Sequence, residues 1–123
     1  MFVDDVDRLA FLGLLQDVTT RWDWLFHALC LMTNHYHLVV ASSRESLSRG
    51  MHRLNGVYAQ RFNQRHARWG HVFGDRFGCR VVEEDKHLET VCAYVLRNPV
   101  RAGLCERPSD WPWSYSRYGY EIG

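Results

Sequence analysis

The sequence has no apolar run of the roughly 20 residues that a membrane-spanning helix needs. Its longest apolar stretch, residues 25–32, is interrupted by His27 and predicts a buried strand instead. The first residues are acidic, with Asp4, Asp5 and Asp7, a composition that argues against a signal or transit peptide. These two absences predict a cytoplasmic protein that has no membrane partner.

Paired cysteines and linkers are also missing. The four cysteines, Cys30, Cys79, Cys92 and Cys105, form no C-x-x-C pair, which argues against a zinc ribbon or a disulfide framework and favours buried free thiols. The 123 residues hold only three prolines and no repeat or low-complexity tract. Because 46% apolar and 24% charged residues are ordinary for a globular chain, we expect one domain over residues 1–123.

Lysine is almost absent, since Lys86 is the only one. Arginine is concentrated between Arg44 and Arg80, where eight arginines stand against two acids, Glu45 and Asp75, for a segment charge of +6. The planar fork of arginine suits phosphate groups, so this segment favours a polyanion partner. Taken alone, the excess is explained equally well by a solvated helix face in an arginine-rich protein.

The apolar pattern predicts six elements in the order helix, strand, strand, helix, strand, helix. Residues 24–32 and 35–41 predict two strands, which a turn at Thr33 and Asn34 joins into a hairpin. Asp4 or Asp5 caps the first helix, whose apolar positions recur at helical spacing: Val6, Leu9, Ala10 and Leu14.

The second half of the chain predicts two helices, one strand and an aromatic tail. Residues 77–82 predict the third strand, and Asp85 caps a last helix that ends or kinks near Pro99. The tail over residues 111–115 is expected to pack back on the body because it is strongly aromatic. Before these elements, Ser43 caps a long arginine-rich helix that ends near residue 70 and carries an apolar stripe: Leu47, Met51, Leu54, Tyr58 and Phe62.

This order predicts an α+β fold that is ferredoxin-like (RRM-like): an antiparallel sheet with helices on one face, without its first strand and with an extra C-terminal helix that carries Tyr94. The missing strand is central in that topology, so the strand of His35 and the third strand lose their shared neighbour. Three explanations stay open. The strand is encoded upstream of Met1, the chain is a decayed remnant, or the third strand closes directly against the histidine strand.

His35 and His37 are the first candidate site residues. Residues two apart in a strand point to the same face, so the two imidazoles project together and make half of a metal site. Alone, such a pair is a weak indication of metal binding. A structural metal site lacks a fourth strong ligand here, because His27 on the adjacent strand is expected to be a core or edge histidine.

Tyr94 and Asn98 are the second pair, since residues four apart share one face of a helix. A carboxamide oxygen one turn from a tyrosine could place the phenol beside a metal ion and supply a third protein ligand. Of the six tyrosines, only Tyr94 has Asn or Gln four residues later on a predicted helix. The alternative is that Tyr94 is a half-buried packing residue, which is commoner for helical tyrosines.

Four segments together resemble one family. Residues 32–40, MTNHYHLVV, resemble the HUH strand of the insertion-sequence single-strand DNA transposases, especially their REP-associated tyrosine transposase branch. Residues 70–77, GHVFGDRF, resemble that branch's glycine-aromatic-arginine segment. Residues 94–104, YVLRNPVRAGL, are similar to its tyrosine helix and the turn after it, and residues 109–114, SDWPWS, to its tail.

The resemblance implies that Tyr94 is the nucleophile and that His35, His37 and Asn98 bind a divalent metal, Mg²⁺ or Mn²⁺. It implies a transposase that cleaves and joins single-stranded or hairpin DNA through a 5′-phosphotyrosine, as a monomer or homodimer. A catalytically inactive remnant that only binds DNA is the alternative. In either case arginines would hold the DNA backbone: Arg44, Arg49, Arg53, Arg61, Arg76 and Arg80.

Overall fold

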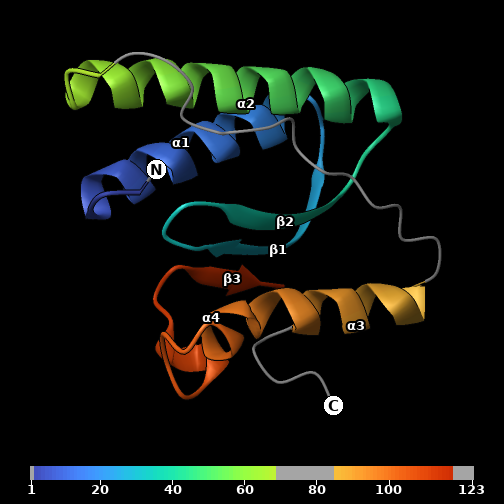
Figure 1. Ribbon diagram of the computed structural model, residues 1–123. Helices are drawn as coiled ribbons and strands as arrows, with labels where there is room; N and C mark the ends of the chain where they lie inside the picture. The colour runs from blue at the N-terminus through green and yellow to red at the C-terminus, as the bar shows by residue number, and fades with distance from the viewer. Residues whose placement is uncertain (1, 69–84, 118–123) are drawn as a thin grey trace. The chain divides into compact units, whose positions relative to one another are not determined.

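The structure is a computed structural model that describes residues 2–68 and 85–117 (Figure 1). It is α+β, as predicted, with a three-stranded sheet and several helices. The contacts group the chain into two compact units, one of helices and one built on the sheet, and we describe each by itself. The predicted strand over residues 77–82 lies outside the described residues, and the single domain over residues 1–123 stays a prediction.

Helix α1 (Asp5–Arg21) begins as predicted at Asp4. The Asp4 side chain accepts a hydrogen bond of 3.1 Å from the backbone N–H of Asp7, which satisfies one of the donors that the first turn leaves open. No helix of the described residues is long and apolar enough to cross a membrane.

Of the apolar positions predicted for α1, Leu14 lies on the buried face but Val6 and Leu9 do not. Val6 and Leu9 are 55% and 60% exposed, whereas the buried face is formed by Asp7, Phe11, Leu14, Leu15 and Val18. The cause is that α1 carries apolar residues around its whole circumference, so periodicity alone does not choose a face. A carboxylate, Asp7, lies on the buried face because cations of α2 neutralise it.

Helix α2 (Arg44–Arg65) also begins at its predicted cap, since the Ser43 hydroxyl accepts a hydrogen bond of 3.2 Å from the N–H of Ser46. It ends at Arg65, a few residues earlier than expected. The predicted stripe faces α1: Met51, Leu54, Tyr58 and Phe62 are buried, and Leu47 is half-buried. The stripe therefore supplies the core between the two helices, which lie side by side (Figure 1).

Aromatic rings and one indole hold the two helices together. The ring centroids of Phe2 and Phe11 lie 5.5 and 5.4 Å from the ring centroid of Tyr58. After α1, the Trp24 indole N–H donates a hydrogen bond of 3.1 Å to the carbonyl of Ser46 in the first turn of α2. Its ring lies so close to Gly50 that a β-carbon there would be 2.2 Å from Cζ2 of the indole.

A charged cluster joins the opposite ends of these helices. Arg65 contacts the carboxylates of Asp4 and Asp7, each at 2.7 Å, and Nε2 of His66 lies 2.9 Å from Asp7. Burial raises the pKa of Asp7, but the hydrogen bonds from Arg65 and His66 outweigh burial and hold that pKa below its usual value. The cluster leaves Asp7 charged inside the helical unit.

In the sheet unit, β1 (Leu25–Leu31) and β2 (Tyr36–Ala41) form the predicted hairpin. The turn is closed by a hydrogen bond of 2.9 Å from the N–H of Met32 to the carbonyl of His35. His27 is buried on β1, in agreement with its predicted place in the core.

The predicted packing of the aromatic tail is confirmed, and the tail adds a strand that the sequence did not predict. β3 (Ser114–Ser116) pairs antiparallel with β1, with Cys30 opposite Ser114, so the sheet order is β2-β1-β3 (Figure 1). The Trp111 indole N–H donates a hydrogen bond of 2.9 Å to the carbonyl of Leu31. The tail thus covers one edge of β1.

Helix α3 (Asp85–Leu96) is the predicted helix that carries Tyr94, and the short α4 (Asn98–Arg101) and the 3₁₀ turn Pro108–Asp110 follow it. The predicted break near Pro99 is confirmed. Cys30 and Cys92 are buried free thiols as expected, Cys105 is a half-buried one, and Cys79 lies outside the described residues.

Candidate metal and tyrosine site

His35 directly precedes β2 and His37 is its second residue, and the two rings are brought together as predicted. Their ring centroids are 5.0 Å apart, and the ring planes are nearly perpendicular at 85°. His35 is exposed and its Nδ1 lies 2.7 Å from Oδ1 of Asn34, while His37 is half-buried. One imidazole is therefore open to solvent and the other is partly enclosed by the protein.

An apolar cluster packs α3 against this part of the sheet. Val95 of α3 packs with Cys30 and Met32 of the first strand and its turn, and Val39 of β2 packs against the same cluster. His37 and Val39 are two residues apart in β2 and share one face of the strand. The residue beside Tyr94 thus contacts the sheet face that carries the histidines.

Arg101 connects the tyrosine and the asparagine. Its guanidinium carbon lies 3.8 Å from the centroid of the Tyr94 ring, which is a cation–π contact. The same guanidinium donates hydrogen bonds of 2.7 Å to the Tyr94 carbonyl and 2.8 Å to Oδ1 of Asn98. Tyr94 itself is 59% exposed, which argues against the alternative that it is a half-buried packing residue.

The positive charge of Arg101 also affects the pKa of His37. Burial lowers the pKa of His37 first, and the positive charges of His35 and Arg101 lower it further. The neutral form of His37 is therefore favoured, and neutral imidazole is the form that binds metal ions. Within the described part of the chain, neither imidazole makes a hydrogen bond to Tyr94 or Asn98.

Asn98 is oriented by the break in the helix, so Tyr94 and Asn98 belong to two successive helical segments rather than to one continuous helix. α3 ends at Leu96 and Asn98 is the first residue of α4. Pro99 has no N–H to donate to the carbonyl of Val95 four residues earlier. The Asn98 side-chain amide donates to that carbonyl instead, at 3.0 Å, which leaves its oxygen facing Arg101.

The two imidazoles fit a divalent metal ion in chemistry and in spacing. With metal–nitrogen bonds of about 2.1 Å, two imidazoles on neighbouring coordination positions have ring centroids roughly 4.5 to 5.3 Å apart, and His35 and His37 lie within that range at 5.0 Å. The Asn98 oxygen adds a neutral oxygen donor. Among the described residues no group of three or more His, Cys, Asp or Glu side chains could hold a metal ion.

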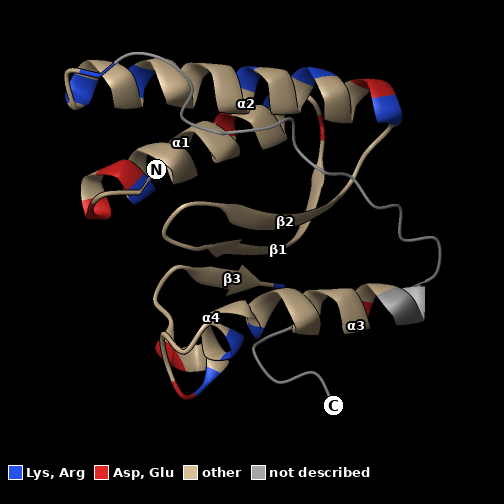
Figure 2. Cartoon of the chain, viewed as in Figure 1, with Lys and Arg blue, Asp and Glu red and all other residues tan. Residues whose placement is uncertain are grey.

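The predicted DNA-contacting arginines are partly described. Arg44, Arg49, Arg53 and Arg61 are all exposed on α2, where basic residues follow the length of the helix (Figure 2). Arg49 forms an exposed ion pair of 2.9 Å with Glu45. Arg76 and Arg80 lie outside the described residues.

Sequence reasoning missed Arg101. The signal was present, because Arg101 follows Asn98 by three residues and Tyr94 by seven, both helical spacings that bring side chains to one face.

Comparison with known proteins identifies the family. The family model described as "Transposase IS200 like" matches residues 1–98, and the chain belongs to this family of transposases. No curated protein matches the chain. A solved structure of a REP-associated tyrosine transposase bound to a REP hairpin has the same fold, with a TM-score of 0.73 at 17% sequence identity. The match covers 85% of this chain and 61% of that one, so this chain spans less than two thirds of its structural relative.

Proposed function

We propose that this protein cleaves and rejoins single-stranded DNA through a covalent bond between Tyr94 and a 5′-phosphate. The observation that carries the proposal is the cluster of Tyr94, Asn98 and Arg101 beside the histidine pair, in a chain of the IS200-like transposase family. The structural relative is bound to a hairpin, which supports a nucleic-acid substrate of the same kind here.

The chemistry needs one nucleophile and one leaving group. The phenol oxygen of Tyr94 attacks the phosphorus, its proton passes to solvent, and the bond between phosphorus and the 3′-oxygen breaks. The 3′-oxygen takes up a proton and leaves as a hydroxyl. A second 3′-hydroxyl then attacks the phosphotyrosine and restores the phenol, so the joining step conserves the phosphodiester bond energy and needs no nucleotide triphosphate.

We assign His35, His37 and Asn98 as the ligands of a Mg²⁺ or Mn²⁺ ion. Such an ion supplies Lewis-acid polarisation of the scissile phosphate and neutralises charge that develops on its oxygens. The two imidazoles favour Mn²⁺ or another transition ion, while the oxygen of Asn98 suits either metal. The three proposed ligands belong to the same compact unit.

Arg101 is a positioning residue in this scheme. It fixes the backbone carbonyl of Tyr94 and the side chain of Asn98, and its guanidinium lies over the phenol ring. A phosphate that approaches Tyr94 meets this cation, which attracts it electrostatically. Arg101 therefore links the nucleophile to the metal ligand.

The test is the formation of a denaturation-resistant adduct. The full chain is incubated with end-labelled single-stranded hairpin DNA and Mn²⁺ or Mg²⁺, and the products are separated by denaturing electrophoresis. We expect a shifted protein–DNA band for the wild type, none for Tyr94→Phe, and a strong loss for His35→Gln and His37→Gln. Tyr115→Phe, which removes an exposed phenol elsewhere in the same unit, is the matched control and keeps the band.

Two results separate the proposal from its alternative. If the wild type binds the hairpin but forms no adduct with either metal, the chain is a binding module without catalysis. If Tyr94→Phe still forms the adduct, another residue is the nucleophile and the assignment is overturned.

A further inference from the structure

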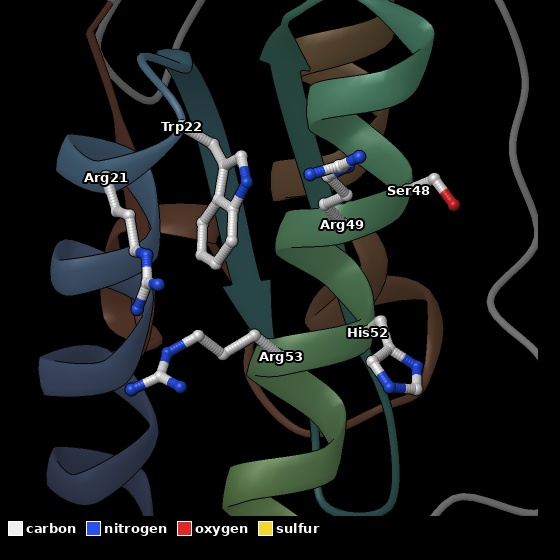
Figure 3. Close-up of a pocket in the computed structure, with 6 residues that line it drawn as sticks. All are labelled: Arg21, Trp22, Ser48, Arg49, His52 and Arg53. Atoms are coloured by element: carbon white, nitrogen blue, oxygen red, sulfur yellow. The ribbon is translucent and has the colours of Figure 1, made fainter.

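A basic pocket lies in the helical unit, apart from the tyrosine and its neighbours. It has a volume of about 510 Å³ and is open to solvent. Trp22 and Arg21 line it from the end of α1, and four residues line it from the first turns of α2: Ser48, Arg49, His52 and Arg53. Figure 3 shows the indole of Trp22 between the two helices, with Arg21 and Arg53 pointing into the space beside it.

The charge of the pocket is strongly positive. Three arginines line it, and His52 adds a ring that can donate a hydrogen bond. The acid that neutralises part of this charge is Glu45, which pairs with Arg49 at 2.9 Å. Both side chains of this ion pair are exposed, Arg49 by 68% and Glu45 by 75%, so an incoming phosphate can compete with Glu45 for Arg49.

The pocket also contains a flat aromatic surface. Trp22 is half-buried, and the guanidinium carbon of Arg21 lies 4.9 Å from its ring centroid. An indole ring and a guanidinium plane are the two side-chain surfaces on which unpaired nucleic-acid bases stack. Arginine forks that bind phosphate beside such a surface match the two parts of a nucleotide, its base and its phosphate.

We propose that this pocket binds one unpaired nucleotide of the DNA substrate, with its base stacked on Trp22 and its phosphates held by Arg21, Arg49 and Arg53. The pocket continues the arginine-rich surface of α2, which favours a nucleic acid over an acidic peptide as the occupant. The proposal rests on the proposed function in that its ligand is part of the single-stranded DNA that Tyr94 cleaves. The pocket would add base stacking on Trp22 to the electrostatic attraction of DNA by the arginines.

The experiment measures binding of the full chain to two probes by fluorescence anisotropy. One probe is a labelled oligothymidine of about 12 nucleotides, within the site sizes typical of single-strand binding proteins. The other is an abasic strand of equal length and charge. We expect the wild type to bind the oligothymidine more tightly than the abasic strand.

Substitution of Trp22 tests the stacking surface. Because one stacked base contributes about 1 to 3 kcal/mol, Trp22→Ala is expected to weaken oligothymidine binding about tenfold and to leave abasic binding nearly unchanged. Trp22→Phe retains an aromatic face and is expected to restore most of the difference. Circular dichroism at the helix bands checks that both variants are folded.

Substitution of Arg53 tests the phosphate contacts. Arg53→Gln is expected to weaken both probes alike and to reduce the dependence of log Kd on log salt by about 0.7, the value for one single-strand phosphate. Arg107→Gln removes the same charge from an exposed position in the sheet unit and is the matched control. It is expected to change binding much less than Arg53→Gln.

Three outcomes overturn the proposal. If Trp22→Ala and Trp22→Phe both bind oligothymidine as tightly as the wild type does, base stacking on Trp22 is excluded. Equal effects of Arg53→Gln and Arg107→Gln exclude a phosphate site in the pocket. Displacement of the labelled oligothymidine by polyglutamate at a lower concentration of charge than unlabelled oligothymidine requires assigns the pocket to an acidic peptide.

The two proposals fail separately. A wild type that forms no adduct contradicts the proposed function, while the binding differences at Trp22 still decide the pocket.

Discussion

Arg101 holds Tyr94 and Asn98 through three different contacts, and its guanidinium carbon lies 3.8 Å from the centroid of the Tyr94 ring. The same guanidinium occupies the Asn98 oxygen that we assign as a metal ligand. Arg101 therefore has two opposite effects in the proposed site. It positions the nucleophile, and it competes with the metal for one donor atom.

These effects predict that Arg101→Ala changes the affinity for the metal and the reaction rate in opposite directions. With the charge-assisted hydrogen bond lost, we expect the single-turnover rate of adduct formation at saturating Mn²⁺ to fall about tenfold. The apparent affinity for Mn²⁺, measured by electron paramagnetic resonance, is expected to rise about threefold, because a competing donor and a nearby positive charge are removed.

Arg97→Gln is the control for this measurement, since Arg97 is an exposed arginine of the same segment. It is expected to change neither quantity. Parallel loss of Mn²⁺ affinity and rate in Arg101→Ala contradicts the prediction and indicates that Arg101 only maintains the local fold.

The cluster of Asp4, Asp7 and Arg65 predicts that stability falls in acid. The hydrogen bond from Arg65 lowers the pKa of Asp4 to about 2, and the pKa of Asp7 is also lowered. Carboxyls whose pKa is lower in the folded state stabilise the fold above their unfolded pKa of about 3.9, and that stabilisation is lost as the pH falls through the folded values. The free energy of unfolding in urea is expected to decrease from about pH 5 to about pH 2.

Asp7→Asn tests the cause of this dependence. Removing one partner of a buried ion pair leaves Arg65 and His66 without their buried anion, and we expect a loss of about 2 kcal/mol at neutral pH. The acid-induced decrease is expected to be smaller in this variant. An Asp7→Asn curve parallel to that of the wild type would show that other carboxyls cause the acid sensitivity.

The contact between Gly50 and Trp24 predicts opposite effects for two similar substitutions in α2. Alanine normally favours a helix by about 1 kcal/mol over glycine, and Gly56→Ala is expected to stabilise by this amount because its β-carbon meets nothing within 4 Å. Gly50→Ala is expected to destabilise by about 1 to 3 kcal/mol, because the added carbon overlaps the indole. Thermal unfolding of both variants measures the difference, and stabilisation by both would contradict the packing of Trp24.

Features set by local sequence were predicted well. Asp4 and Ser43 cap their helices through hydrogen bonds to the residue three positions later, and Pro99 interrupts the last helix through its missing N–H. The stripe of α2 is strongly periodic, so its buried face follows from spacing alone. The histidine pair is likewise a local feature, since strand geometry fixes which residues share a face.

Features set by distant partners were not predictable. Asp7 is buried because Arg65 reaches it from 58 residues away, and no local pattern indicates this. The strand Ser114–Ser116 is too short for a periodic signal and exists because β1 offers an open edge. The contact between the Arg101 guanidinium and the Tyr94 ring depends on the path of the chain after Pro99, which residue spacing predicts only in outline.

The replacement of a backbone hydrogen bond by the Asn98 side chain predicts energetic coupling between Asn98 and Pro99. In the wild type, the carbonyl of Val95 accepts only from the Asn98 amide at this break, since Pro99 has no N–H. Asn98→Ala is expected to destabilise by about 1 to 2 kcal/mol because this carbonyl loses its donor. In a Pro99→Ala background, the N–H of the new alanine can donate to the same carbonyl, so Asn98→Ala is expected to cost about 1 kcal/mol less.

Urea unfolding of the wild type, both single variants and the double variant measures this coupling, and it does so independently of catalysis. Additive effects of the two substitutions would mean that the amide does not replace the proline's missing donor. In that case the direction of the Asn98 oxygen would rest on the hydrogen bond from Arg101 and not on the helix break, which would weaken its assignment as the third metal ligand. A coupling of the expected size supports the view that the helix break at Pro99 exists to turn this oxygen outward.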